Sequence, residues 1–194
     1  MPFFKPPQKV PLWVKFLVWI GDRAAGRKVM PSRILAWYPR ALISSGIFEG
    51  LVTYKDRSID HRTLKLVRMQ VSFTVSCPFC IDMNSFEFEK DRITDEEIEA
   101  LQGFKTIEDV ASFSDREKIA LRYAASICST PIQVPEDLVG RLKIQFTERE
   151  IVIIASTAAQ VNYWTRLIQA FGIMPAGFTD NCPVLKLDRY TRKE

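Results

Sequence analysis

The chain is poor in histidine and in cysteine, and these shortages exclude several classes of site. Its 194 residues include one histidine, His61, and four cysteines. A zinc or di-iron centre that takes two or more histidine ligands therefore cannot form. Four cysteines at uneven spacing are also too few for the disulfide framework of a small secreted domain.

Glycine and long apolar runs are scarce as well. There are only eight glycines, and no segment alternates apolar and polar residues between hairpin turns, so the pattern predicts an all-α fold. The apolar stretch Leu12–Ile20 contains Lys15 and is far shorter than the roughly 20 residues that span a bilayer. The N-terminal residues show no secretory signal pattern. We therefore expect a cytoplasmic protein with no membrane partner.

The overall composition is that of an ordinary globular protein. Hydrophobic residues make up 47% of the chain and charged residues 26%, and the net charge of +4 is too small to predict a nucleic-acid partner. The order of predicted elements suggests an N-terminal arm and short helix over residues 1–30, one main domain over 31–178 and a tail over 179–194. Within the first two segments we expect helices near 12–25, 32–38 and 39–52.

Helix starts are the clearest local signals. Thr94, Ser114 and Thr147 are each followed three residues later by a glutamate, which is the pattern of a capping box. Asp60 can cap a fourth helix. The helix after Thr147 keeps its apolar period for nearly seven turns, until Gly172 predicts its end. The similar starts at Asp60, Ser114 and Thr147 also hint at a repeated helical hairpin.

The segment Cys77-Pro78-Phe79-Cys80 is the main candidate for chemistry. Pro78 favours the first turn of a helix, so Cys77 is expected at the N-cap and Cys80 three residues on, where the two sulfurs can meet. The partial positive charge of a helix N-terminus stabilises a thiolate. This geometry predicts a redox pair. Two alternatives are a buried pair that only packs and half of a metal site.

A zinc site would need a second pair of ligands. Cys128 and Cys182 are far apart in the sequence and show no such spacing, so we expect them to be structural. Asn162 and Arg166 lie one turn apart on the last long helix and either face the cysteines or, as we favour, face solvent.

The segment Leu66–Asn84, with the sequence LVRMQVSFTVSCPFCIDMN, resembles the core motif of the alkylhydroperoxidase D / carboxymuconolactone decarboxylase family. In that motif a helix leads into Cys-x-x-Cys-x-x-x-His. The order of predicted helices over residues 31–175 is similar too. The resemblance implies a multi-helical bundle that assembles as a trimer, hexamer or dimer, with no cofactor and no metal.

The resemblance also implies a function. Cys80 would attack a hydroperoxide and Cys77 would close the disulfide, in a thiol-dependent peroxidase or disulfide oxidoreductase that a thiol protein reduces. Decarboxylase members of the family lack the cysteine pair, which points away from a lyase. The alternative is a family member that has lost redox chemistry and serves binding or assembly.

Two positions depart from the family pattern. Asn84 stands where the family has its proton-relay histidine, and Lys65 where it commonly has a glutamate. An asparagine can hydrogen-bond a thiolate or a peroxide but cannot accept a proton near neutral pH. Lys65 either points inward and stabilises a thiolate or is a solvated helix residue. We expect Asp82 to face away from Cys80 and His61 to lie on the surface. Peroxide turnover should therefore be slow, or the reaction should have shifted to disulfide exchange or to another substrate.

Overall fold

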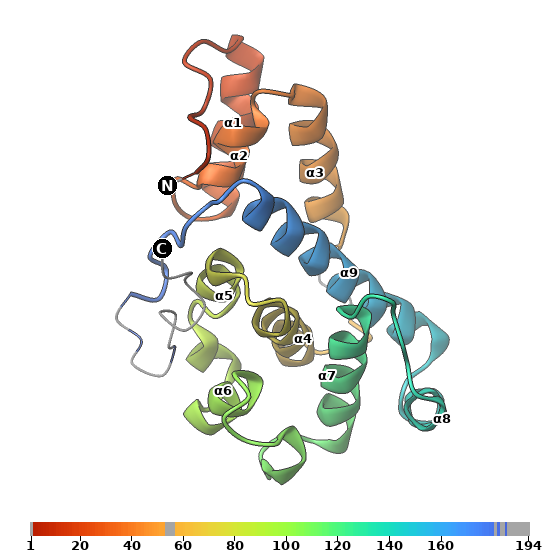
Figure 1. Cartoon of the computed structure of the whole chain (residues 1–194). Coiled ribbons are helices and arrows are strands. Elements are labelled where there is room, and N and C mark those ends of the chain that lie inside the picture. The colour runs from red at the N-terminus through yellow and green to blue at the C-terminus, as the bar shows by residue number, and fades with distance from the viewer. Residues whose placement is uncertain (1, 53–56, 181, 183–184, 186–194) are drawn as a thin grey trace.

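The computed structural model of the protein describes residues 2–52, 57–180, 182 and 185. Every regular element in this part of the chain is a helix, so the all-α prediction is confirmed (Figure 1). The elements are α1 (Leu12–Ala24), α2 (Met30–Leu35), α3 (Pro39–Val52), α4 (His61–Thr74), α5 (Pro78–Asn84), η1 (Phe88–Asp91), α6 (Asp95–Leu101), η2 (Ile107–Asp109), α7 (Asp115–Ile127), α8 (Glu136–Gln145) and α9 (Glu148–Ala170). None of the described helices is both long and apolar enough to cross a membrane.

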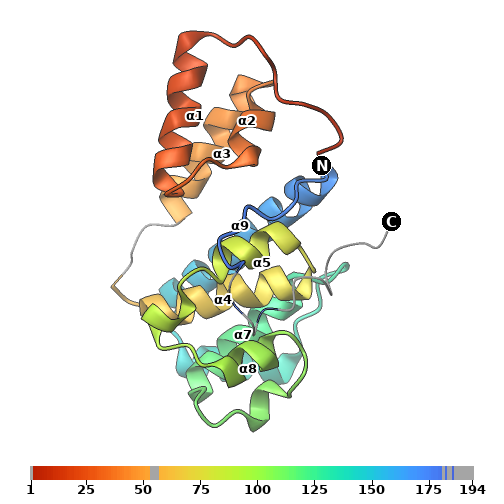
Figure 2. The same ribbon diagram turned by 90° about the vertical axis from the view of Figure 1, so that its left-hand side faces the viewer.

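Helices α1, α2 and α3 pack against one another at one end of the molecule, and α3 also packs on α9 (Figure 2). Their small core contains Val14, Leu35 and Leu42. The bounds predicted for α1 and α3 agree with the structure. The prediction of 32–38 for α2 was wrong by a few residues, because Pro31 occupies an early helical position, where its missing N–H costs nothing.

Helix α4 is the centre of the remaining bundle. It packs against α5, α7 and α9, which surround it in Figure 1. Val67 and Val71 face a core shared with α7, α8 and α9, whereas Leu66, Met69 and Phe73 face a second core shared with α5 and α6. Because both faces are buried, α4 holds the segment that follows it in a fixed position.

All three predicted capping boxes are present. In each, the N-cap hydroxyl accepts a hydrogen bond from the backbone N–H of the glutamate, and the glutamate carboxylate accepts one from the N-cap N–H. The pairs are Thr94 with Glu97, Ser114 with Glu117, and Thr147 with Glu150. Asp60 caps α4 through the N–H of Thr63. The sequence therefore places these helix starts correctly.

Two arginines join these capped helix starts to one another. Arg62, in the first turn of α4, forms ion pairs with Glu97 at 2.6 Å and with Glu117 at 2.7 Å. Arg116, in the first turn of α7, pairs with Glu150 at 2.7 Å. Burial acts to lower the pKa of Arg62, but its two carboxylate partners outweigh burial and raise it. The repeated start pattern thus corresponds to a series of contacts between successive helices.

The chain after α9 turns back over α5. Gly172 adopts a positive φ of 63°, and a Cβ there would lie 2.6 Å from the ring of Phe3. The buried carboxylate of Asp82 then accepts hydrogen bonds from the N–H of Ala176 and from the N–H and hydroxyl of Thr179, each at 2.8 Å. Of the predicted tail 179–194, residues 181, 183–184 and 186–194 lie outside the described residues.

Candidate functional site

A tight turn separates α4 from α5. Ser76 adopts a left-handed conformation with φ of 53°, its N–H donates to the carbonyl of Phe73, and the N–H of Cys77 donates to the carbonyl of Ser72. This is the Schellman arrangement that ends many helices, usually with glycine at the left-handed position. It ends α4 and presents Cys77 directly as the N-cap of α5.

The two cysteines are in contact at the start of α5. The Cys77 sulfur accepts a hydrogen bond from the N–H of Cys80 at 3.4 Å, and the two sulfurs are 2.7 Å apart. Both are free thiols, and their residues are 0% and 4% exposed. The predicted positions at the N-cap and three residues into the helix are confirmed.

The charge state expected from the helix N-terminus is wrong for Cys80. Burial raises the pKa of its thiol well above the usual value, and the neighbouring Cys77 raises it further. Burying a thiolate away from water costs more free energy than the N-terminus of a short helix recovers. Reaction at Cys80 therefore requires a group that takes up its proton and a charge that stabilises the thiolate.

Cys80 lines a small cavity of about 30 Å³ between α3, α4, α5 and α9, whereas Cys77 does not line it. That volume is enough for about one water-sized group. The lining residues are Glu49, Arg68, Phe79, Cys80, Met83, Asn84, Gln160, Val161, Trp164 and Ile168. Cys80 is therefore the sulfur that a small molecule in this cavity would meet.

The cavity contains a carboxylate and a guanidinium that sequence analysis did not identify. The Glu49 carboxylate accepts hydrogen bonds from Gln160 Nε2 at 2.5 Å and from Trp164 Nε1 at 2.7 Å. Burial lowers the pKa of Arg68, and the charge of Glu49 opposes that shift. These residues come from three helices. The one available signal was that Glu49 is the only acidic residue of the otherwise mainly apolar segment 39–52.

Of the two positions that depart from the family pattern, only Asn84 lies at the cavity. It lines the cavity and its Nδ2 donates to the hydroxyl of Ser72 at 2.9 Å. The ammonium of Lys65 instead donates to the carbonyl of Phe86 at 2.6 Å and lies 3.9 Å from Asp91. Burial lowers the pKa of Lys65, and Asp91 opposes the shift. The cation that α4 supplies to the cavity is Arg68, not Lys65.

Other expectations about single residues are confirmed. The His61 side chain is 61% exposed and pairs with Asp91, and Asp82 binds the segment after α9 rather than the cysteines. Cys128 is buried, its thiol donates to the carbonyl of Ala124, and burial raises its pKa to about 11. Cys182 packs beside the core that α4 shares with α5 and α6.

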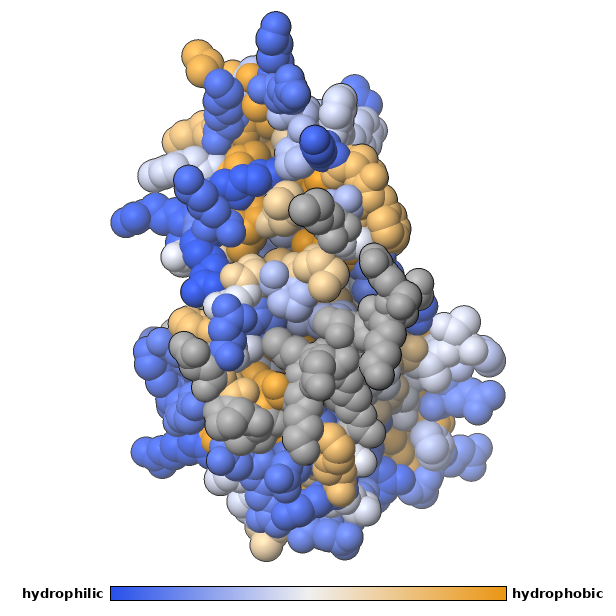
Figure 3. Space-filling model, turned by 60° about the vertical axis from the view of Figure 1, so that its left-hand side comes forward, coloured by the Kyte–Doolittle hydropathy of each residue, from blue (hydrophilic) through white to orange (hydrophobic). Residues whose placement is uncertain are grey.

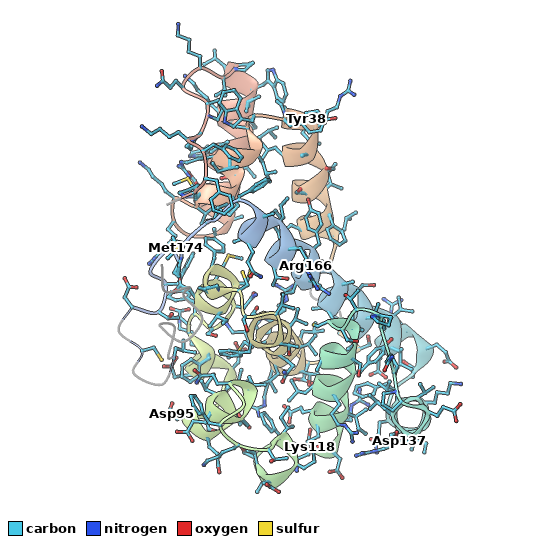
Figure 4. The ribbon with its side chains drawn as sticks, in the orientation of Figure 1. Tyr38, Asp95, Lys118, Asp137, Arg166 and Met174 are labelled. Atoms are coloured by element: carbon cyan, nitrogen blue, oxygen red, sulfur yellow. The ribbon has the colours of Figure 1, made fainter. Side chains whose placement is uncertain are left out.

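Asn162 and Arg166 line a separate, open groove along α9 (Figure 4). Arg166 is exposed, as expected for a solvated face, and its guanidinium donates to Asn162. Neither residue lines the cysteine cavity.

Comparisons with known proteins agree with this architecture. No family model matches the chain. YdfG of Bacillus subtilis (strain 168), described as uncharacterised, is 30% identical over 119 residues, which are 61% of this chain and 79% of YdfG. YnjA of Escherichia coli (strain K12), also described as uncharacterised, is 24% identical over 172 residues, which are 89% of this chain and 93% of YnjA.

Solved structures define the class of fold. An alkylhydroperoxidase AhpD core, peroxidase-related protein from Ralstonia eutropha JMP134 superposes with a TM-score of 0.73 at 17% identity, covering 91% of this chain and 94% of that one. The debrominase Bmp8, in complex with 2,3,4-tribromopyrrole, gives a TM-score of 0.76 at 15% identity, covering 98% of each chain. The chain shares this fold and has a buried dithiol at the start of α5. It is an all-helical protein of the AhpD-like class. Together with the resemblance to YdfG, it shows that the chain belongs to the alkylhydroperoxidase D-like family.

Proposed function

We propose that the protein is a thiol-dependent peroxidase or disulfide oxidoreductase that works through Cys77 and Cys80. The observation that carries the proposal is the contact of two free cysteine sulfurs, 2.7 Å apart, of which one lines a cavity. Cys80 is assigned as the attacking thiol because it faces the cavity. Cys77, fully buried behind it, is assigned as the resolving thiol.

The reaction with a hydroperoxide has two steps. The Cys80 thiolate attacks the terminal peroxide oxygen, the O–O bond breaks, and the alcohol leaves while Cys80 becomes a sulfenic acid. The Cys77 thiol then attacks that sulfur, so that water leaves and a disulfide forms. A dithiol reductant returns both cysteines to thiols by exchange. In disulfide exchange without peroxide, the same pair passes its two electrons to another disulfide.

The cavity volume and the free thiols indicate the size of the substrate and the cellular compartment. A cavity of about 30 Å³ suits hydrogen peroxide or the terminal oxygens of a small organic hydroperoxide. A reduced pair is maintained in the cytoplasm, where thiol systems keep cysteines reduced, so we assign the protein to that compartment. We further propose that it is a homo-oligomer, since large apolar side chains of α1 and α3 are exposed.

Fold alone does not select this activity. Bmp8 is a debrominase with the same architecture, so other substrates for the buried thiols must be tested alongside hydroperoxides. The alternative function is a non-redox family member that only binds or assembles. This alternative predicts that both thiols stay reduced with every oxidant, at concentrations that do not denature the protein.

The direct test is a thiol count after one equivalent of oxidant. The reduced protein is mixed with hydrogen peroxide, cumene hydroperoxide, oxidised glutathione or 2,3,4-tribromopyrrole, and the free thiols are measured by peptide mass spectrometry. We expect the hydroperoxides to convert Cys77 and Cys80 to a disulfide. Cys80→Ser should abolish oxidant consumption, and Cys77→Ser should leave a sulfenic acid that dimedone traps at Cys80.

Cys128→Ser provides the matched control, because Cys128 is a buried thiol outside the cavity. It should consume hydroperoxide like the wild type. Retention of both thiols at Cys77 and Cys80 with every oxidant would overturn the proposal and favour the binding or assembly alternative. Reaction with tribromopyrrole alone would assign the pair to dehalogenation instead.

A further inference from the structure

The buried thiol of Cys80 requires a proton acceptor, and neither position at which the family places its relay supplies one. Asn84 cannot accept a proton near neutral pH, and Lys65 is bound to Phe86 and Asp91 away from the cavity. The charged groups that do line the cavity with Cys80 are Glu49 from α3 and Arg68 from α4. Glu49 lies outside the segment Leu66–Asn84 that resembles the family motif, whereas Arg68 lies within it.

We propose that Glu49 and Arg68 replace the family's proton relay at Cys80, with Glu49 as the proton acceptor and Arg68 as the charge that stabilises the thiolate. This inference rests on the proposed function and names the residues that drive it. Glu49 is the catalytic residue in this scheme because it exchanges a proton with the reacting sulfur. Arg68 acts electrostatically on the same sulfur.

Two contacts fix the Glu49 carboxylate in the cavity. Gln160 Nε2 and Trp164 Nε1, both on α9, donate to the same oxygen, Oε2. Such donors hold the carboxylate in one orientation, and a base can act either directly or through one intervening water. The cavity has room for one water-sized group that could connect Glu49 with Cys80.

Arg68 lines the same cavity as Cys80. Its charge is balanced at longer range by Glu49. An arginine always carries its charge, so it can stabilise a thiolate and then the oxygen anion that leaves the peroxide. A guanidinium in this cavity offsets part of the free energy that is needed to ionise a buried thiol.

Gln160 supplies independent evidence that the cavity receives a polar molecule. The residue is 1% exposed, and among the described residues its Oε1 has no hydrogen-bond partner. A buried amide oxygen without a partner is costly, and in native structures it marks a place for water or a ligand. The O–H of a hydroperoxide is a donor that Oε1 can accept while Arg68 donates to the peroxide oxygens.

The proton and electrons balance within this set of groups. Glu49 takes the proton from the Cys80 sulfur as the hydroperoxide enters, and the thiolate attacks the terminal oxygen. The O–O bond breaks, Cys80 becomes a sulfenic acid, and Glu49 returns its proton to the alkoxide, which leaves as the alcohol. The sulfur is oxidised and the peroxide is reduced, with no further reactant needed for this step.

The other groups around Cys80 do not offer the same chemistry. Cys77 is the remaining titratable group that contacts it, and it belongs to the resolving step. From α9 the cavity receives Gln160 and Trp164, which do not titrate, and from α5 it receives Asn84. A pH dependence measured at Cys80 therefore reports on Arg68, Glu49 and Cys77.

The test measures two properties of the protein, and the proposal predicts that Glu49→Gln changes them in opposite directions. The first is the pH profile of Cys80 alkylation by iodoacetamide in a Cys77→Ser background, which gives the apparent pKa of the thiol. The second is the rate of hydroperoxide consumption with both cysteines present. Variants are Arg68→Met, Arg68→Lys and Glu49→Gln, each checked for helix content.

We expect Arg68→Met to raise the apparent pKa of Cys80 and to slow both alkylation at pH 7 and peroxide consumption about tenfold, since one nearby charge shifts a pKa by about one unit or more. Arg68→Lys should recover part of both rates. Glu49→Gln should lower the pKa and speed alkylation, because it removes a nearby negative charge, yet slow peroxide consumption about 100-fold through loss of the base.

Matched controls are Lys118→Met on α7 and Asp137→Asn on α8 (both labelled in Figure 4), which remove charges from residues that do not line the cavity. Both should leave the two readouts unchanged. The proposal is overturned if Glu49→Gln consumes peroxide at the wild-type rate, or if the Glu49 and Arg68 variants shift alkylation in the same direction, as general loosening of the fold would. If the wild type consumes no hydroperoxide, the proposed function fails, while the alkylation profiles still decide whether Arg68 stabilises the thiolate.

Discussion

The bundle of α4 to α9 and the N-terminal unit of α1 to α3 bury their side chains to very different extents. In the bundle, charged residues at helix starts pair with one another, and apolar residues of α4 are covered on two faces. In the N-terminal unit many large apolar side chains are exposed, as the orange residues at that end of Figure 3 indicate. They include Leu12 (81%), Trp13 (51%), Phe16 (58%), Trp19 (56%), Ile47 (59%) and Leu51 (74%).

This difference shows that the two regions serve the molecule in different ways. The bundle positions the turn that precedes Cys77 and pairs the charged residues at its helix starts. The N-terminal unit supplies one residue to the site, Glu49, and otherwise presents aromatic surface of the kind found at the core of protein interfaces. Four experiments, in order of decreasing effect, test this division.

The largest effect is expected from a charge on the exposed face of α1. Phe16 stacks on Trp19 with ring centroids 5.8 Å apart. If this face joins copies of the chain, Phe16→Glu should reduce the mass in light scattering from that of an oligomer to that of a monomer. Ile144→Glu, at an even more exposed position on α8, should keep the wild-type mass. A wild-type protein that is monomeric would contradict the prediction.

The next effect concerns the charged contacts within the bundle. Arg62→Met leaves Glu97 and Glu117 without their cation, and the Glu97 side chain is fully buried. Breaking one partner of a buried ion pair costs about 3 to 5 kcal/mol. Urea denaturation should show a loss of this size in the free energy of unfolding. Arg23→Met, on the exposed side of α1, should change it by less than about 0.5 kcal/mol. Equal losses in both variants would refute the distinction between the two regions.

A smaller effect comes from the buried thiol of Cys128 at alkaline pH. Its pKa is raised from the usual 9.0 to about 11 in the folded protein. A raised pKa means that the folded state keeps a proton that the unfolded chain loses, so its contribution is complete below pH 9 and is lost as pH rises through about 11. Because one pKa unit is worth about 1.4 kcal/mol, the loss should be at most about 3 kcal/mol. Cys128→Ala should flatten the unfolding free energy over this range, and an unchanged slope would contradict the shift.

The smallest effect lies at the turn between α4 and α5. Ser76 has a φ of 53°, which costs a residue with a Cβ about 1 kcal/mol and costs glycine much less. Ser76→Gly should therefore raise the free energy of unfolding by about 1 kcal/mol. The rate of Cys80 alkylation should stay the same. A destabilised variant would show that the Ser76 side chain contributes more than its strained backbone costs.

Much of the fold follows from short patterns in the sequence. The capping boxes at Thr94, Ser114 and Thr147 and the position of Cys77 before Pro78 are local, because each depends on hydrogen bonds within one turn. Helix α8 was not predicted, since it lacks a side-chain cap and begins after Pro135. The order of the other α-helices could be stated from the sequence, whereas the short 3-10 helices η1 and η2 were not predicted either.

The candidate site likewise has some features that the sequence determines and others that it does not. The sequence alone determined that two cysteines meet at the start of a helix, because residues three apart share a helix face, and that the family's relay histidine is replaced by Asn84. It did not determine that burial raises the pKa of the Cys80 thiol, since burial depends on what packs around the residue. Nor did it show that Arg68 and Glu49 line the same cavity as Cys80. Those residues meet only because α3, α4 and α9 pack around one cavity, and contacts between distant segments leave no local pattern in the chain.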